Sequence, residues 1–122
     1  MKHLFSLLLA ATSLIGCQSN TEFKSVDAQQ FAEVIANKDV QLVDARTPEE
    51  FSEGHIPGAV NIDVKSENFD TQIAQLDSSR PVTVYCRSGR RSKLAAERMT
   101  NAGLQVTELA DGILSWKGEV VK

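Results

Sequence analysis

The chain has 122 residues, of which 42% are hydrophobic and 24% charged, and its formal net charge is −3 at neutral pH. This length allows one small domain with a single core. A mildly acidic balance argues against nucleic-acid binding, which normally leaves a basic footprint. Basic charge gathers at 87–93, and a short basic loop of this kind suits a small anion.

The first 16 residues predict a secretory signal peptide. Lys2 and His3 give a positive start, and the apolar run "LFSLLLAATSLI" follows. This run is too short for a membrane-spanning helix, which needs ~20 apolar residues. A buried N-terminal helix is the alternative, but the run has no polar face. We therefore expect residues 1–16 to be absent from the folded protein.

The motif "LIGC" at 14–17 resembles the lipobox of bacterial lipoproteins. The resemblance implies that the Cys17 thiol is lipidated, and that Gln18 directs the protein to the outer membrane, facing the periplasm. Residues 17–24 would then form a lipidated tether and residues 25–122 the folded domain. Cleavage removes one lysine, so twelve basic residues face sixteen acidic ones and the formal charge becomes −4.

The first predicted element of the domain is an amphipathic helix. Asp27 is the expected N-cap, with Gln30 three residues later as its capping-box partner. Phe31, Val34 and Ile35 share one face of this helix. We therefore expect this face to pack against the core.

Strands and helices alternate along the rest of the chain. Short apolar runs at 40–45 and 59–62 predict strands, and Pro48 and Gly54 bracket a short helix between them. The later segments are a helix at 67–76, a strongly apolar and therefore central strand at 81–86, a helix at 90–103, a strand at 104–109 and a short helix at 113–118. This alternation predicts an α/β sandwich, with a mostly parallel sheet covered on both faces.

The helix predicted at 90–103 should pack on this sheet. We expect Leu94, Ala95 and Met99 to face inward, and Gly103 to be the C-cap.

The segment "YCRSGRRS" at 85–92 carries the clearest chemical signal. Cys86 lies at the carboxyl end of a strand, which is where α/β folds bind ligands. A tight loop before a helix turns backbone N–H groups inward, and Gly89 permits the close approach that such a loop requires. Arginines at 87, 90 and 91 add positive charge, and nearby cations stabilise a reactive thiolate.

A purely structural alternative is a buried cysteine followed by solvated arginines. Arginine at a helix start opposes the helix dipole, so this alternative gives no reason for three of them. If Cys17 is lipidated, Cys86 is the sole free thiol, and neither an intrachain disulfide nor a zinc site can form. We therefore interpret Cys86 as a nucleophile.

Three segments together, "LVDARTPEEFSEGHIPGAVNI", "VTVYCRSGRRS" and "DGILSWKG", resemble a single-domain rhodanese-like sulfurtransferase. The resemblance runs from about residue 25 to the end of the chain. It implies a rhodanese-like three-layer sandwich with Cys86 as the sulfur-accepting nucleophile. The implied substrate-binding residues are Arg87, Ser88, Gly89, Arg90 and Arg91.

The resemblance also implies a reaction. Cys86 would take a sulfane sulfur from a small anionic donor such as thiosulfate, and the resulting persulfide would pass it to cyanide or a thiol. A protein thiol is a further candidate acceptor. This is covalent catalysis in a ping-pong order, and no metal or organic cofactor is implied.

Three other positions match the residues that the family uses to frame the site, and we expect structural roles for them. Arg46 should pair with Glu49 or Glu50, and His55 should bond to backbone in a turn. Asp44 should accept hydrogen bonds from backbone amides or from an arginine.

Near the C-terminus, the motif departs mildly from the family. The family's "GG" is Asp111–Gly112 here, a change that we expect to be tolerated, and Trp116 should pack the closing helix onto the core.

Two other functions compete with sulfur transfer. A cysteine-dependent phosphatase or an arsenate reductase uses a similar loop, but the phosphatase signature needs arginine six positions after the cysteine. That position is Ser92, and arginine falls one residue earlier, at Arg91. The other candidate is a rhodanese-like module that only binds partners or carries sulfur, and an absent Cys86 would have favoured it.

Overall fold

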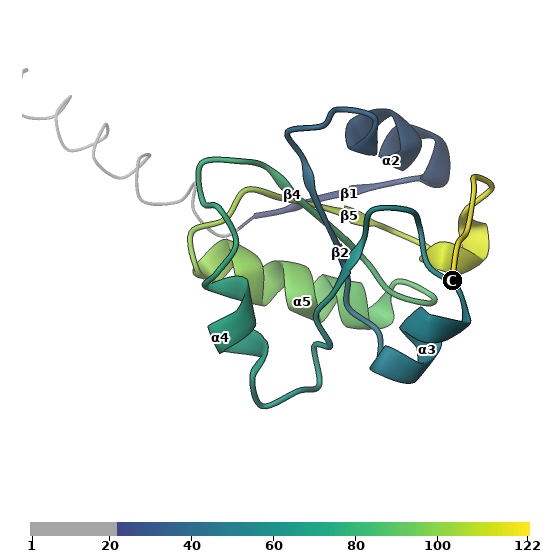
Figure 1. The fold of residues 1–122 in the computed structure, drawn as a ribbon. Helices are drawn as coiled ribbons and strands as arrows, with labels where there is room; N and C mark the ends of the chain where they lie inside the picture. Colours follow the sequence, from purple (N-terminus) through teal and green to yellow (C-terminus); the bar gives the residue numbers. More distant parts are fainter. Residues whose placement is uncertain (1–21) are drawn as a thin grey trace, which may run out of the picture.

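The computed structural model describes residues 22–122, in which the strands form one sheet of order β1-β5-β4-β2-β3 (Figure 1). The strands are β1 (Lys24–Val26), β2 (Gln41–Asp44), β3 (Val60–Asn61), β4 (Val82–Tyr85) and β5 (Val106–Leu109). The helices are α2 (Ala28–Ile35), α3 (Pro48–Glu53), α4 (Phe69–Ile73), α5 (Arg90–Asn101) and the 3₁₀ turn η1 (Ile113–Ser115). Every pairing in this sheet is parallel, so the carboxyl ends of the strands meet at one edge.

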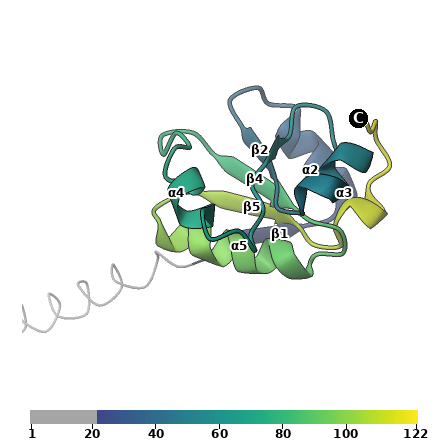
Figure 2. The ribbon, with the colours of Figure 1, turned by 60° about the horizontal axis from the view of Figure 1, so that its bottom comes forward.

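Helices cover both faces of the sheet, which confirms the predicted three-layer α/β sandwich (Figures 1 and 2). Neighbouring residues of a strand point to opposite faces of the sheet, so the strands contribute side chains to two hydrophobic cores. On one face α4 and α5 pack against the valines of the sheet through Phe69, Ile73, Ala95, Ala96 and Met99. On the other face Phe31 of α2 packs with Leu42, Tyr85 and Leu109.

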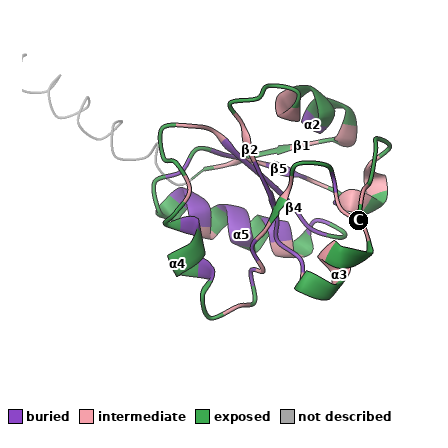
Figure 3. Ribbon diagram, in the orientation of Figure 1, coloured by how far each residue is buried: buried purple, intermediate pink, exposed green. Residues whose placement is uncertain are grey.

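Strand β4 is the middle strand of the sheet, as predicted from its apolar sequence. All four of its residues are buried, and the ribbon coloured by burial shows it within the interior (Figure 3). The chain leaves β4 directly into the loop that contains Cys86. The most protected strand therefore supports this loop.

The predicted starts of the first two helices are confirmed by their capping contacts. The Gln30 N–H donates to Asp27 Oδ1 at 2.8 Å, and the Gln30 side chain accepts from the Asp27 N–H. Pro48 begins α3 and Gly54 is its C-cap. These contacts join residues only a few positions apart, so the local sequence suffices to specify them.

The orientation predicted for Leu94 is wrong. Leu94 is 49% exposed, whereas Ser92, Ala95 and Met99 form the inward stripe of α5. Residues on one face of a helix recur every three or four positions, as Ser92, Ala95 and Met99 do. Leu94 lies two positions after Ser92 and therefore falls outside this face. Gly103 takes a left-handed conformation just after the C-cap, not at it.

Strand β1 was not predicted, because "KSV" is short and mostly polar. It forms by pairing in parallel with β5, and Phe23 packs against the core beside it. Lys24, assigned to the tether, therefore belongs to the sheet. Residues 1–16, Cys17 and the rest of the tether up to residue 21 lie outside the described residues. Within 22–122, no helix is long and apolar enough to cross a bilayer.

Candidate active site

Cys86 directly follows β4, and its residue is only 1% exposed. The chain then turns through a short loop, and α5 begins at Arg90. Strand, loop and helix therefore bring the thiol to the carboxyl edge of the sheet, where ligands of parallel α/β folds bind. The sequence placed Cys86 at this same edge.

Two backbone N–H groups point at the Cys86 sulfur. The Gly89 N–H donates to Sγ with an N···S distance of 3.1 Å, and the Ser92 N–H donates at 3.2 Å. Inward-facing amides of this kind form an anion-binding nest, and the dipole of α5 acts in the same direction. The loop is therefore suited to hold negative charge on the sulfur.

Two glycines allow this loop to pack against the segment that follows β5. Gly89 has φ of +104°, and a Cβ there would collide with the Ala110 carbonyl oxygen. Gly112 has φ of +72°, and its Cβ would collide with the Arg87 carbonyl group. Any larger side chain at either position would push the loop away from its place around the sulfur.

Backbone hydrogen bonds hold the same two segments together. The Ile113 N–H donates to the Cys86 carbonyl at 2.8 Å, and the Leu114 N–H donates to the Arg87 carbonyl at 3.1 Å. Asp111, which replaces a glycine of the family motif, is exposed and has a negative φ. No glycine is required there, which explains why the substitution is compatible with the fold.

The three arginines of the loop differ in their surroundings. Arg87 and Arg90 are exposed, as is Ser88. Arg91 is partly buried and makes two hydrogen bonds to Glu50 of α3, at 2.7 and 2.9 Å. The hydrogen bonds from Arg91 lower the pKa of Glu50 to about 2, although desolvation of the carboxylate opposes this shift. Arg91 is therefore already paired, and Arg87 and Arg90 are the loop cations that face solvent.

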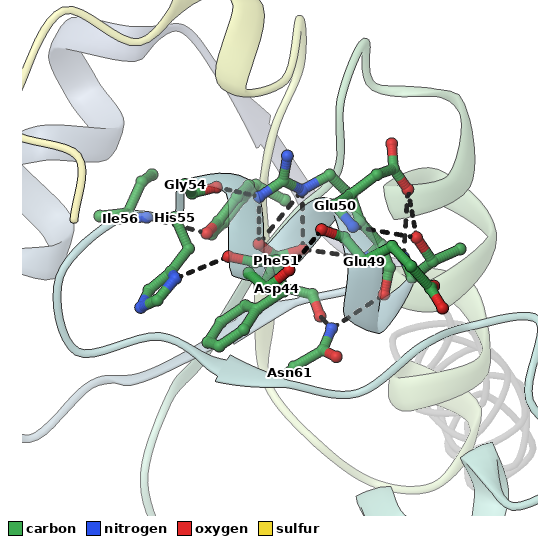
Figure 4. Close-up of polar contacts among 12 residues, drawn as sticks. Asp44, Glu49, Glu50, Phe51, Gly54, His55, Ile56 and Asn61 are labelled. Atoms are coloured by element: carbon green, nitrogen blue, oxygen red, sulfur yellow. Dashed lines mark hydrogen bonds and ion pairs between the residues drawn. The ribbon is translucent and has the colours of Figure 1, made fainter. Parts of the chain in front are cut away.

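The predicted partner of Arg46 is wrong. Arg46 pairs with Asp44 (Nη2–Oδ2 2.7 Å) and not with Glu49 or Glu50, and it also donates to the Gly54 carbonyl at 2.7 Å. The two partners, Asp44 and Gly54, are labelled in Figure 4. Glu50 is occupied elsewhere, and the buried Asp44 lies closest to the guanidinium. The expectation for Asp44 is confirmed, since it accepts from the Arg46 backbone N–H at 2.9 Å as well as from the side chain.

Neighbouring side chains tie this ion pair to the sheet. Asn61 donates to the carbonyls of Asp44 (3.0 Å) and Arg46 (2.8 Å). Figure 4 labels Asn61 and Asp44 and shows the contact between them. The Arg46 guanidinium lies 5.8 Å from the centre of the Tyr85 ring, and the Tyr85 hydroxyl accepts from the Ile56 N–H at 3.0 Å. Burial raises the pKa of Tyr85 above its ordinary value, so this hydroxyl stays neutral.

His55 and Trp116 have the structural roles that the sequence predicts. His55 Nδ1 lies 2.9 Å from the Phe51 carbonyl oxygen, and the two rings stack with centroids 3.7 Å apart (Figure 4). The His55 backbone also pairs with Val121. Trp116 packs edge-on against Phe31 with ring centroids 6.2 Å apart, and so joins the C-terminal segment to the core.

Glu108 is a residue near the site that the sequence analysis did not identify. It is fully buried, and its carboxylate accepts from Ser92 Oγ at 2.6 Å and from Ser25 Oγ, while Lys93 Nζ lies 3.1 Å away. Val106 and Glu108 are two apart in β5 and so face the same core. A charged residue on the apolar face of a predicted strand was the signal that could have revealed it.

A shallow cavity of about 650 Å³ opens at the opposite, amino-terminal edge of the sheet. It is lined by residues such as Lys24, Pro81 and Gln105, and no residue of the Cys86 loop borders it. The nucleophile and the inward amides are at the other edge. We therefore assign the candidate active site to the loop and not to this cavity.

Known proteins resemble the chain over most of its length. The family model described as Rhodanese-like domain matches residues 27–119. The chain is 35% identical over 97 residues to thiosulfate sulfurtransferase GlpE of Shewanella oneidensis, and this alignment covers 79% of the present chain and 94% of GlpE. A rhodanese-related protein of Thermoplasma volcanium shares the fold with a TM-score of 0.72 at 28% identity, covering 81% of this chain and 98% of that one.

A further relative has a name of a different kind. The chain is 34% identical over 122 residues to the HTH-type transcriptional regulator Rv0324 of Mycobacterium tuberculosis, which covers 95% of this chain. The match spans 50% of the regulator's length, so the chain corresponds to half of that protein. The family model matches well over half of the present sequence, and the fold and the relatives agree with it. The chain belongs to the family of rhodanese-like domains.

Proposed function

We propose that the protein is a thiosulfate sulfurtransferase-like enzyme in which Cys86 carries the transferred sulfur as a persulfide. One observation carries the proposal: the N–H groups of Gly89 and Ser92 both point at a buried cysteine sulfur. The kinship with GlpE, whose name states thiosulfate sulfurtransferase activity, supports the same chemistry.

The proposed reaction has two steps. The Cys86 thiolate attacks the outer sulfur of thiosulfate, forming a new S–S bond while the old S–S bond breaks and sulfite leaves with the electron pair. Cyanide or a thiolate then attacks the outer sulfur of the Cys86 persulfide, giving thiocyanate or a new persulfide and releasing the Cys86 thiolate. A protein thiol is a candidate for this second nucleophile. Negative charge stays at the sulfur throughout, which suits the inward amides.

The loop has features that suit an anionic donor. Arg87 and Arg90 are exposed beside the sulfur-bearing residue, and positive charge at a site raises the local concentration of small anions. Ser92 occupies the position where phosphatases have an arginine, and its hydroxyl bonds to the buried Glu108. The serine in place of an arginine at this position favours sulfur transfer over phosphate hydrolysis.

Intact-mass analysis tests the proposal directly. After incubation with thiosulfate, the domain should gain the mass of one sulfur atom, and cyanide should remove it with release of thiocyanate. Cys86→Ser should abolish both steps while leaving the melting temperature nearly unchanged, because the substitution is close to isosteric. Sulfur transfer by that variant would contradict the role of Cys86. Loading of sulfur without turnover would favour the carrier or binding module, and rapid aryl phosphate hydrolysis would favour the phosphatase.

We also propose that the protein is a lipoprotein anchored through Cys17 in the bacterial cell envelope, facing the periplasm. The support is the sequence "LIGC" at the end of an apolar run. Full-length protein should fractionate with membranes, and Cys17→Ser should lose the lipid and alter processing. Unlipidated wild-type protein in the soluble fraction would refute the anchor. Several acyl chains are needed for firm attachment, so mass analysis should count them.

A further inference from the structure

A buried network behind the loop reaches both residues that donate to the Cys86 sulfur. The Ser92 hydroxyl donates to Glu108 Oε2 at 2.6 Å, while the backbone N–H of the same residue donates to the Cys86 sulfur. The Gly89 carbonyl accepts from Lys93 Nζ at 3.2 Å, and the same ammonium group lies 3.1 Å from Glu108 Oε1. Glu108 therefore bonds directly to the side chain of one donor residue, Ser92, and reaches the other, Gly89, through Lys93.

The burial of Glu108 calls for an explanation. Its side chain is 0% exposed, and an ionised carboxylate is costly to bury unless charged and hydrogen-bonding partners satisfy it. The partners are Ser25, Ser92 and Lys93, and the Lys93 ammonium also donates to the Ala110 carbonyl at 2.9 Å. Well-packed apolar residues often stabilise a core as well as a buried ion pair does. Stability alone therefore does not account for a carboxylate here.

We infer that Glu108 is a positioning residue of the sulfur-binding loop. Through the Ser92 hydroxyl it sets the start of α5, and through Lys93 it holds the Gly89 carbonyl outward, which leaves the N–H groups of both residues on the sulfur. Glu108 touches neither the sulfur nor the solvent. The inference rests on the proposed function, because it assigns a role in the same transfer step.

Single-turnover kinetics separate positioning from stability. Glu108→Gln and Ser92→Ala should each slow persulfide formation from thiosulfate at least roughly tenfold, at a temperature where every variant is folded, since misdirected donors stabilise the developing charge less well. Because the two residues act as one unit, the double variant should be no slower than the slower single variant. Ser92→Thr, which keeps the hydroxyl, should restore much of the rate.

Leu104→Ala provides a matched control for stability. Leu104 is a core residue near the opposite edge of the sheet, so its truncation should lower the melting temperature and leave the rate per folded molecule unchanged. Wild-type rates in Glu108→Gln and Ser92→Ala would overturn the inference, as would effects that simply multiply in the double variant. If Glu108→Gln does not fold, Ser92→Ala alone decides, because it alters no charge and keeps the backbone N–H.

Alkylation of Cys86 by iodoacetamide gives a readout that does not depend on sulfur transfer. Ser92→Ala should react more slowly than wild type at neutral pH, because its N–H, no longer held in place by the bond to Glu108, donates less well to the negative sulfur. Alkylation at the wild-type rate would overturn the positioning role. If the wild-type protein forms no persulfide at all, the proposed function fails, while slow alkylation of both Ser92→Ala and Glu108→Gln still supports the positioning role of the Ser92–Glu108 contact.

Discussion

Two arginine–carboxylate pairs flank the loop of Cys86, and they differ in burial. In the Asp44–Arg46 pair the side chains are 0% and 7% exposed, whereas in the Glu50–Arg91 pair they are 26% and 20% exposed. The shortest N–O distance is 2.7 Å in both pairs. The contact geometry is alike, so the surroundings must decide what each pair does.

Burial makes the Asp44–Arg46 pair part of the fold. Loss of either partner leaves a charge that water cannot reach, and such a charge is strongly destabilising. Water can replace either partner of the Glu50–Arg91 pair, so its loss should cost little stability. Arg91 follows Cys86 by only five positions, however, and losing its partner should alter the charge near the sulfur. One pair should therefore govern stability and the other the reaction.

The largest expected effect is on the buried pair. Asp44→Ala should lower the free energy of unfolding by about 3–5 kcal/mol, because it leaves the Arg46 guanidinium buried and unpaired. Urea unfolding would measure this. Asp70→Ala is the matched control: the Asp70–Arg98 pair has the same N–O distance of 2.7 Å, but its side chains are 74% and 35% exposed, and its loss should cost about 0–1 kcal/mol. Equal losses in the two variants would show that burial does not separate the pairs.

The close approach of Gly112 to the Arg87 carbonyl involves no charge, and it allows effects on the Cys86 loop to be separated from effects on the stability of the fold. Gly112→Ala forces a Cβ into the Arg87 carbonyl at φ +72°, so it should cost about 1–3 kcal/mol and slow sulfur transfer by about 10²-fold. Gly103→Ala has a similar φ of +96° but meets no atom within 4 Å. It should lose stability and keep the wild-type rate per folded molecule. A slow Gly103→Ala variant would mean that strain anywhere in the domain disturbs the loop.

Steady-state kinetics can show whether the partly exposed Glu50–Arg91 pair acts through its charge. Arg91→Ala leaves the Glu50 carboxylate beside the loop and should raise KM for thiosulfate several-fold, whereas Glu50→Gln frees the Arg91 charge and should lower KM. Each should change the free energy of unfolding by no more than about 1 kcal/mol. If both variants raise KM equally, the pair acts through its geometry and not through its charge.

The smallest effect is on the acid stability of the domain. The pKa of Glu50 falls from its ordinary 4.5 to about 2 in the folded state, because Arg91 donates to the carboxylate. The lowered value means that this carboxylate stabilises the fold above pH 4.5 and that its contribution is lost as the pH falls toward 2. Thermal unfolding should therefore show a smaller loss of stability between pH 5 and 3 in Glu50→Gln than in wild type, with the exposed Glu49→Gln behaving like wild type. Identical pH profiles for wild type and Glu50→Gln would contradict this.

Features encoded within a few residues were predictable from the sequence. The Asp27–Gln30 capping box and the helix between Pro48 and Gly54 depend on contacts between near neighbours along the chain. The apolar run before Cys86 correctly predicts a buried central strand, because only such a strand can bury every one of its side chains. Parallel topology then places the cysteine at the edge where parallel α/β folds bind ligands.

The tertiary structure alone decided which distant side chains meet. Glu50 and Arg91 are 41 positions apart, and Ser25 and Glu108 are 83 positions apart. Arg46 had several acidic neighbours in sequence, and only folding left Asp44 as its buried partner. Similarly, β1 forms only because β5 offers an open edge. Hydrogen bonding and helical periodicity act over a few residues and can be read locally, whereas ion-pair partners are selected by burial, which exists only once the chain has folded.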